Sequence, residues 1–170
     1  MTIGSALSRP RLTETFRVAL IAAAMGVLCA AAARPVFAGG DWNDSGIQWK
    51  SYEDGLAAAK KDNNPILLIF YTEWCPHCAN YSKVFHDPKV IEQSKNFVMV
   101  RVDNDKNKEL AKQYAPDGGY IPRTFFLSSD GQLDADLHET RDQYKYFYSE
   151  SSPTGILGGM ERALAKLKKS

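Results

Sequence analysis

Residues 66–78 read Ile-Leu-Leu-Ile-Phe-Tyr-Thr-Glu-Trp-Cys-Pro-His-Cys, and this stretch decides the fold. Its first six residues are all apolar or aromatic, in a run that is too short for a typical helix, so they predict a buried β-strand. Beyond residue 78 the apolar residues fall at helical spacing instead: Tyr81, Val84 and Phe85. The two cysteines of the stretch are therefore expected at a junction between a strand and a helix.

That junction has chemical consequences for Cys75 and Cys78. Two cysteines separated by two residues can close a small disulfide ring and reopen it with little backbone movement. Unpaired N–H groups and the positive dipole end at a helix N-terminus stabilise a thiolate on the first sulfur. Pro76 suits the first helical turn, where its missing N–H costs nothing. His77 can add a hydrogen bond or a positive charge near that sulfur. The pattern indicates thiol–disulfide exchange.

Metal binding is the main alternative interpretation of the cysteine pair. Zinc takes about four ligands, and a Cys-x-x-Cys half-site usually comes with a second such pair. Here only one further cysteine exists, Cys29, and the histidines are three: His77, His86 and His138. A purely structural disulfide is disfavoured too, because so small a loop removes little entropy from the unfolded chain. Redox chemistry is favoured, with metal handling left open.

Residues 1–38 are interpreted as a cleaved secretory signal peptide, followed by one domain at 39–170. Three arginines precede an alanine-rich apolar block at 18–33, and Val36-Phe37-Ala38 has small residues where a signal peptidase reads them. The block is shorter than the roughly 20 residues needed to span a bilayer. We therefore expect export to the periplasm and no stable membrane insertion after cleavage.

The composition of residues 39–170 narrows the choice of partner. Acidic residues slightly outnumber basic ones there, so neither nucleic acid nor an anionic membrane surface is indicated. Cys75 and Cys78 are the only cysteines of this part. An exported domain with a single Cys-x-x-Cys pair does not use disulfides as scaffolding. We expect the pair to be reactive.

The rest of the chain alternates between helical and strand patterns. We expect a helix at 51–61 capped by Ser51, strands at 97–102 and 124–127, a hairpin turn at 129–131, a fourth strand at 133–137 and an amphipathic C-terminal helix. A helix break is expected at Asp87-Pro88, where a second short helix begins. The order of elements is that of an α/β domain.

The stretch Trp74-Cys75-Pro76-His77-Cys78 resembles the active site of the thioredoxin superfamily, and its Cys-Pro-His-Cys form is similar to that of DsbA-type periplasmic oxidants. Further segments resemble the small single-domain thioredoxin-like proteins of the endoplasmic reticulum, the anterior-gradient group: Trp49, 52–55, 97–100, 116–123 and 144–148. The similarity covers nearly everything after about Trp42. It implies an α/β thioredoxin fold, with a central mixed β-sheet flanked by α-helices.

The resemblance also assigns residues around the cysteines. It implies that Pro122 is a cis-proline facing the pair and that Ile121 offers backbone groups to an incoming peptide. From the residues alone, Pro122 marks only the start of a strand. The resemblance places Trp74 on the substrate-facing surface. We interpret the aromatic run at 144–148 and the tryptophans Trp42 and Trp49 mainly as packing residues.

One position departs from the thioredoxin pattern. Many thioredoxins carry a buried acid six positions before the first cysteine, where it manages the proton of the second cysteine. That position is Ile69 here. Glu73 is close in sequence but is interpreted as an exposed loop carboxylate. The sequence does not indicate how Cys78 loses its proton.

We therefore expect an exported thiol–disulfide oxidoreductase that oxidises or isomerises protein substrates. Cys75 is expected to be the exposed nucleophile and Cys78 the buried resolving thiol. The partners are protein thiols and disulfides together with an unidentified redox partner, and no cofactor is implied beyond the redox-active disulfide Cys75–Cys78. A periplasmic disulfide reductase and a non-catalytic protein-binding or chaperone module are the alternatives.

Overall fold

The structure is a computed structural model of the 170-residue chain, and it describes residue 1 and residues 39–167. Apart from residue 1, the predicted signal peptide lies outside the described residues. The elements, in chain order, are α2 (Tyr52–Asp62), β1 (Ile66–Tyr71), α3 (Pro76–Ser82), the 3-10 helix η1 (Lys83–His86), α4 (Pro88–Ser94), β2 (Val98–Asp103), α5 (Lys108–Gln113), β3 (Arg123–Leu127) and α6 (Thr154–Leu167).

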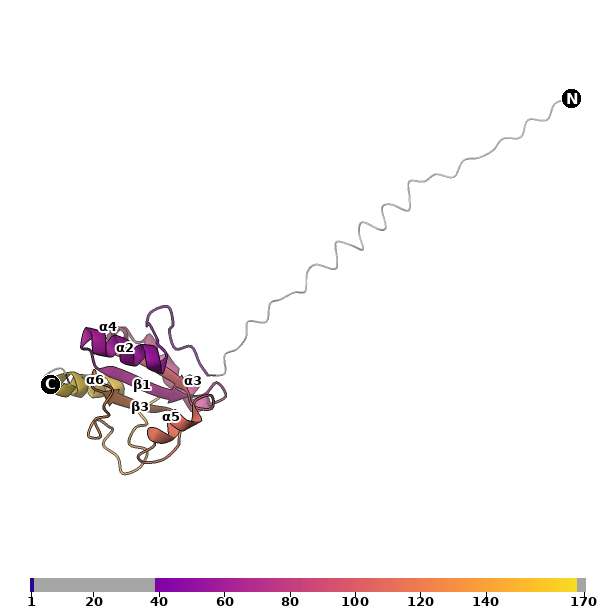
Figure 1. Ribbon diagram of the computed structural model, residues 1–170. Coiled ribbons are helices and arrows are strands. Elements are labelled where there is room, and N and C mark those ends of the chain that lie inside the picture. Colours follow the sequence, from indigo (N-terminus) through magenta and orange to yellow (C-terminus); the bar gives the residue numbers. More distant parts are fainter. Residues whose placement is uncertain (2–38, 168–170) are drawn as a thin grey trace. The chain divides into compact units, whose positions relative to one another are not determined.

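The strand predicted at 66–71 is β1, and it lies at the centre of a sheet with the order β2-β1-β3. β1 runs parallel to β2 and antiparallel to β3. Helices lie on both sides of this sheet (Figure 1). The mixed sheet flanked by helices confirms the predicted fold class.

Alternate side chains of β1 point to opposite faces of the sheet. Leu67 and Ile69 join the core that contains residues of α3, α4 and α6. Ile66, Leu68 and Phe70 join the core that contains residues of α2 and α5. Because both faces of the strand are covered, its sequence is an unbroken apolar run rather than an alternating one. The carboxyl end of this rigid strand carries the loop that leads to the cysteines.

The helices begin where the sequence supplies caps. Ser51 Oγ accepts a hydrogen bond from the Asp54 N–H at 3.1 Å, so α2 begins at residue 52. Asp87 caps α4 in the same way, through the N–H groups of its first turn, and Pro88 occupies the first helical position. The predicted helix break at Asp87-Pro88 and the cap at Ser51 are both confirmed.

The fourth strand predicted at 133–137 is wrong. The turn at 129–131 forms, but only an isolated bridge between Leu127 and Leu133 follows it. Asp134 then turns the chain, because its carboxylate accepts the Asp136 N–H at 3.1 Å. Lys166 of α6 contacts the carboxylates of Asp134 and Asp136, both at 2.8 Å. These local and tertiary bonds replace the ladder of a strand.

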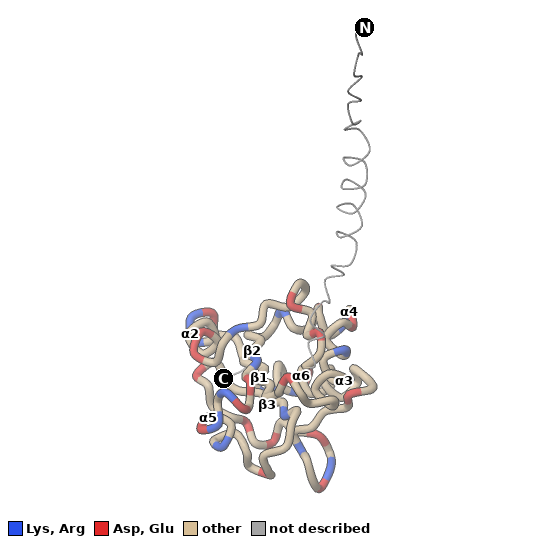
Figure 2. Tube along the Cα trace, turned by 90° about the vertical axis from the view of Figure 1, so that its right-hand side faces the viewer, with Lys and Arg blue, Asp and Glu red and all other residues tan. Residues whose placement is uncertain are grey.

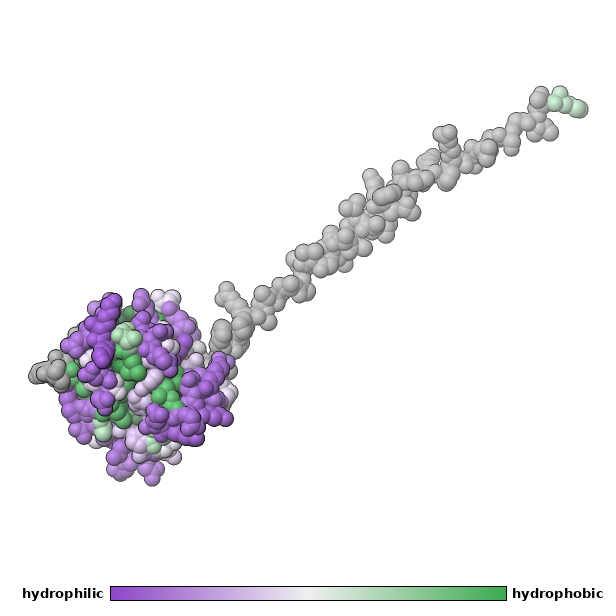
Figure 3. All heavy atoms as spheres, viewed as in Figure 1, coloured by the Kyte–Doolittle hydropathy of each residue, from purple (hydrophilic) through white to green (hydrophobic). Residues whose placement is uncertain are grey.

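The surface of residues 39–167 is mixed in character. Blue and red positions are interspersed along the trace in Figure 2, and the face in Figure 3 is mostly hydrophilic with small apolar areas between. None of the helices within the described range is long and apolar enough to cross a bilayer.

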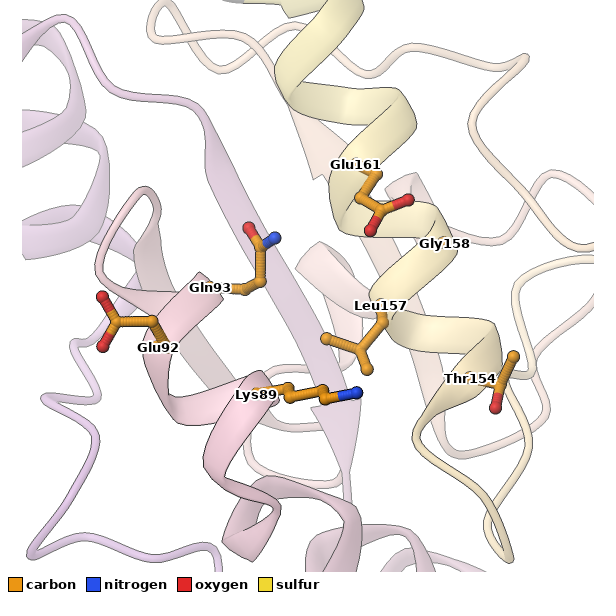
Figure 4. Close-up of a pocket in the computed structure, with 7 residues that line it drawn as sticks. All are labelled: Lys89, Glu92, Gln93, Thr154, Leu157, Gly158 and Glu161. Carbon is orange, nitrogen blue, oxygen red and sulfur yellow. The ribbon is translucent and has the colours of Figure 1, made fainter.

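An open groove lies between α4 and α6 (Figure 4). Its volume is about 540 Å³, and its lining combines charged, polar and apolar residues: Lys89, Glu92, Gln93, Thr154, Leu157, Gly158 and Glu161. It contains neither cysteine nor histidine, so it is distinct from the dithiol site.

Candidate active site

The two cysteines lie at the start of α3, as the sequence predicts. β1 ends at Tyr71 and the helix begins at Pro76, so Cys75 is the N-cap residue. Its sulfur accepts a hydrogen bond from the Cys78 N–H at 3.2 Å. Both residues are free thiols in this structure. The short helical turn places the second sulfur beside the first, which is the arrangement that closing a disulfide requires.

The exposure predicted for Cys75 is wrong. The residue is only 3% exposed, and Cys78 is fully buried. The cover over Cys75 comes from the loop before β3, where the Ile121 carbonyl oxygen lies 3.9 Å from the Cys75 sulfur. The Ile121-Pro122 peptide bond is cis, as predicted. Ile121, 46 positions further along the chain, therefore faces the Cys75 sulfur directly.

Burial has a strong electrostatic effect on Cys78. Removal from water raises the pKa of its thiol, and the hydrogen bond with Cys75 raises it further, against a smaller lowering by a backbone hydrogen bond from Thr72. Ile69 is fully buried in the same core. Glu73 is exposed and pairs with Lys106 at 3.4 Å, which confirms the interpretation of Glu73 as a loop carboxylate. The Thr72 hydroxyl is buried and has no hydrogen-bond partner among the described residues.

Trp74 lies on the surface beside the dithiol. The residue is 66% exposed, and its indole Nε1 donates a hydrogen bond to Asp105 Oδ2 at 2.7 Å. Asp105 follows β2 and was not predicted to contact the site. The parallel pairing of β1 and β2 explains the contact, because the carboxyl ends of parallel strands meet at one edge of the sheet.

His77 does not act alone in this structure. Its Nδ1 lies 3.0 Å from Glu150 Oε2, and its ring meets the Phe147 ring edge-on, with centroids 5.9 Å apart. Glu150 lies 73 positions further along the chain. The sequence analysis missed Glu150, since an acidic residue in a loop carries no pattern of its own.

The aromatic run at 144–148 divides into packing and surface residues. Tyr146 and Tyr148 are buried, as expected for packing residues, while Tyr144 is exposed. Phe147, between the two buried tyrosines, reaches His77. Trp42 is buried and Trp49 packs against the core, which confirms their interpretation.

Arg123, directly after the cis-proline, is another residue to which the sequence analysis gave no role of its own. It is fully buried. Its Nη1 donates to the Tyr120 carbonyl, and its Nη2 donates to Asn104 Oδ1 at 3.1 Å and to the Ala111 carbonyl at 3.2 Å. The guanidinium thus ties the loop before Pro122 to the segments that follow β2 and form α5.

The described residues contain no group of three or more histidine, cysteine, aspartate or glutamate side chains that could hold a metal ion. The chemistry that the geometry offers is that of the two thiols, with the cis-proline loop on one side and a histidine–carboxylate pair on the other.

Comparison with known proteins agrees with this geometry. The model of a thioredoxin-like family matches residues 48–129. The human anterior gradient protein 2 homolog is 30% identical over 128 residues, which cover 75% of this chain and 71% of that protein. A disulphide isomerase from Xylella fastidiosa Temecula1 is 28% identical, with a TM-score of 0.50 over 65% of this chain and 86% of that one. A thioredoxin from Thermus thermophilus shares the fold, with a TM-score of 0.56, 22% identity and coverage of 71% and 89%.

The fold and the dithiol together define a thioredoxin-fold protein of the thiol–disulfide oxidoreductase class. Within that class, the chain belongs to the anterior gradient family of thioredoxin-like proteins.

Proposed function

We propose that this protein is an exported oxidoreductase that oxidises or isomerises disulfides in protein substrates through Cys75 and Cys78. The observation that carries the proposal is the pairing of a free dithiol at the strand–helix junction with the Ile121 carbonyl 3.9 Å from the Cys75 sulfur. A substrate peptide that pairs with this loop would bring its own sulfur to Cys75.

Oxidation of a substrate proceeds in two exchanges. A substrate thiolate attacks the Cys75 sulfur of the Cys75–Cys78 disulfide, and Cys78 leaves as a thiolate that takes up a proton. A second substrate thiolate then attacks the substrate sulfur of the mixed disulfide, and Cys75 leaves. The two electrons gained by the protein pass to a redox partner. In isomerisation, Cys75 instead attacks a substrate disulfide and is later displaced by another substrate thiol.

The activity is tested by insulin reduction and by trapping. Wild type should catalyse exchange, and Cys75→Ser should abolish it. Cys78→Ser should accumulate mixed disulfides, because the resolving thiol is gone, whereas Cys75→Ser should not. A wild-type protein without exchange activity would contradict the proposal and favour a non-catalytic binding module. Full activity in Cys75→Ser would show that the exchange does not depend on this thiol.

The direction of exchange is tested by equilibration with a glutathione buffer. The dipeptide Pro76-His77 matches that of DsbA, whose first thiol has a pKa of about 3.5 against about 7 in thioredoxin. Such stabilisation of the thiolate favours the reduced form, so the disulfide becomes a stronger oxidant. We expect the reduction potential of the Cys75–Cys78 pair to lie above that of thioredoxin. A potential at or below it would identify a reductase.

Export is the second part of the proposal. Val36-Phe37-Ala38 supports cleavage before Gly39, and the alanine-rich leader supports the periplasm as the compartment. Mass spectrometry of the protein from the extracytoplasmic fraction should find Gly39 at the N-terminus. An intact residue 1 or an acylated Cys29 would rule out this processing.

A further inference from the structure

We propose that Glu150 is a positioning residue for the dithiol, which acts by holding the His77 imidazole in the form that stabilises the Cys75 thiolate. The inference rests on the proposed thiol–disulfide exchange and deepens it, since it assigns one control of the redox poise to a residue outside the Cys-x-x-Cys motif.

The contact between the two side chains is close and specific. Glu150 Oε2 lies 3.0 Å from His77 Nδ1, and the side chains are 27% and 61% exposed. A second contact limits the ring, because Phe147 meets it edge-on at 78°. The imidazole is therefore held on two sides by residues of one segment, although His77 lies 73 positions before Glu150 in the chain.

The segment that contains Phe147 and Glu150 is fixed to β3, the strand that follows the cis-proline. Tyr146 and Tyr148 are buried, and the Tyr146 carbonyl accepts the Thr124 N–H at 2.8 Å. Thr124 belongs to β3, two residues after the cis-proline. Tyr146 and Tyr148 thus fix the chain on either side of Phe147, and Glu150 follows two residues later. The carboxylate is positioned by the same strand as the loop that covers Cys75.

The chemistry of the pair selects one form of the ring. An ionised carboxylate only accepts hydrogen bonds, so Nδ1 must carry the proton and Nε2 is left to exchange one. When Cys75 ionises, its S–H bond breaks and the proton passes to water or to Nε2 of His77, which lies two residues further along the first turn of α3. The resulting imidazolium keeps its Nδ1–H bond to Glu150. The proposed roles are those of a nucleophile, a base and a group that orients the base.

Two effects of Glu150 on the thiolate oppose each other, and this makes the proposal testable. Through His77 the carboxylate favours a cation in the same helical turn as Cys75, but its own negative charge repels the thiolate. A cationic group also lies by Phe147, since the Arg141 guanidinium is 5.9 Å from the centre of the Phe147 ring. If Glu150 acts through His77, its removal must have a different effect when His77 is absent.

The experiment measures the glutathione equilibrium and the pH at which thiolate absorbance appears, in wild type, Glu150→Gln, His77→Ala and the double variant. In the wild-type background, Glu150→Gln should shift the equilibrium about threefold toward a more reducing dithiol and move thiolate formation to higher pH. The shift is modest because the pair is partly exposed. In the His77→Ala background, the same change should have no effect or the opposite sign. Glu150→Asp should recover part of the wild-type value.

Glu92→Gln is the matched control, since it removes the same charge from an exposed pair with Lys95 on α4 and should leave both readouts unchanged. An unchanged equilibrium in Glu150→Gln, or an equal shift in both backgrounds, would overturn the inference. Neither result bears on the proposed function, which is tested separately by the exchange of wild type and Cys75→Ser with insulin and by the potential of wild type. Urea unfolding of each variant separates a loss of positioning from a loss of the fold.

Discussion

Gly40 packs against the active-site helix with a φ of +88°, a conformation that side chains rarely adopt. A Cβ there would lie 2.1 Å from Ser82 Oγ and 2.8 Å from the Ala79 Cα. The first residues of the described domain thus lie directly on α3, and only glycine permits the approach. At this scale, one absent methyl group decides whether a segment can reach the helix that carries Cys78.

Gly40→Ala should therefore destabilise the protein by about 1–3 kcal/mol, because both steric overlap and backbone strain oppose the new side chain. Gly119→Ala is the matched control, since a Cβ there would meet nothing within 4 Å. In urea unfolding, Gly40→Ala should have a lower midpoint than wild type, and Gly119→Ala should not. Equal midpoints would contradict the close packing at residue 40.

The raised pKa of Cys78 predicts how stability depends on pH in the reduced protein. Burial keeps this thiol protonated in the fold, while in the unfolded chain it ionises near its ordinary value of 9.0. The buried, protonated Cys78 thiol therefore makes its full contribution to the free energy of unfolding below pH 9. That contribution is lost as the pH rises above 9, because the unfolded chain then gives up the proton more readily than the fold. Reduced wild type should lose stability above pH 9 more steeply than Cys78→Ala, as measured by urea unfolding at several pH values. Identical pH profiles of the two proteins would contradict the raised pKa of Cys78.

At the scale of elements, one buried side chain joins three parts of the fold. Arg123 begins β3, and its guanidinium bonds to the loop before Pro122, to Asn104 after β2 and to Ala111 in α5. It also stacks over Phe70 of β1, with 5.2 Å to the ring centre. The elements that frame the cis-proline loop are therefore held together by one charged group in the core rather than by apolar packing alone.

Arg123→Met should destabilise the protein by about 2–4 kcal/mol, because the Tyr120 and Ala111 carbonyls lose their donor. Exchange with a peptide substrate should weaken mainly through a higher KM, since the loop that faces Cys75 is less well held. Arg141→Met, at an exposed position, should change the stability by less than about 0.5 kcal/mol. An Arg123→Met protein with wild-type stability would show that the network is dispensable.

At the scale of the whole molecule, redox state and stability are linked. If the fold favours the dithiol over the disulfide, the protein is a strong oxidant, and the same preference makes the oxidised fold less stable. We expect the reduced protein to unfold at a higher urea concentration than the oxidised protein, each measured at pH 7 against its own unfolded state. A more stable oxidised form would indicate a reductase.

The sequence predicted much of the architecture, because the decisive signals are local. The apolar run of β1, the cap at Ser51, the break at Asp87-Pro88 and the cysteine spacing each depend on neighbours within a few residues. The wrong predictions also have physical causes. The predicted strand at 133–137 alternates apolar and polar residues, but local aspartate bonds and Lys166 of α6 compete with the ladder.

What only the tertiary structure decided is how distant segments meet at the dithiol. The Ile121 loop covers Cys75, Asp105 holds Trp74, and Glu150 holds His77, at separations of 31 to 73 positions along the chain. None of these contacts has a sequence pattern, because a single polar residue in a loop looks the same whether or not it has a partner. The sequence by itself determined the position of the dithiol, at the junction of a strand and a helix. The pairing of β1 with its two neighbours decided what surrounds it.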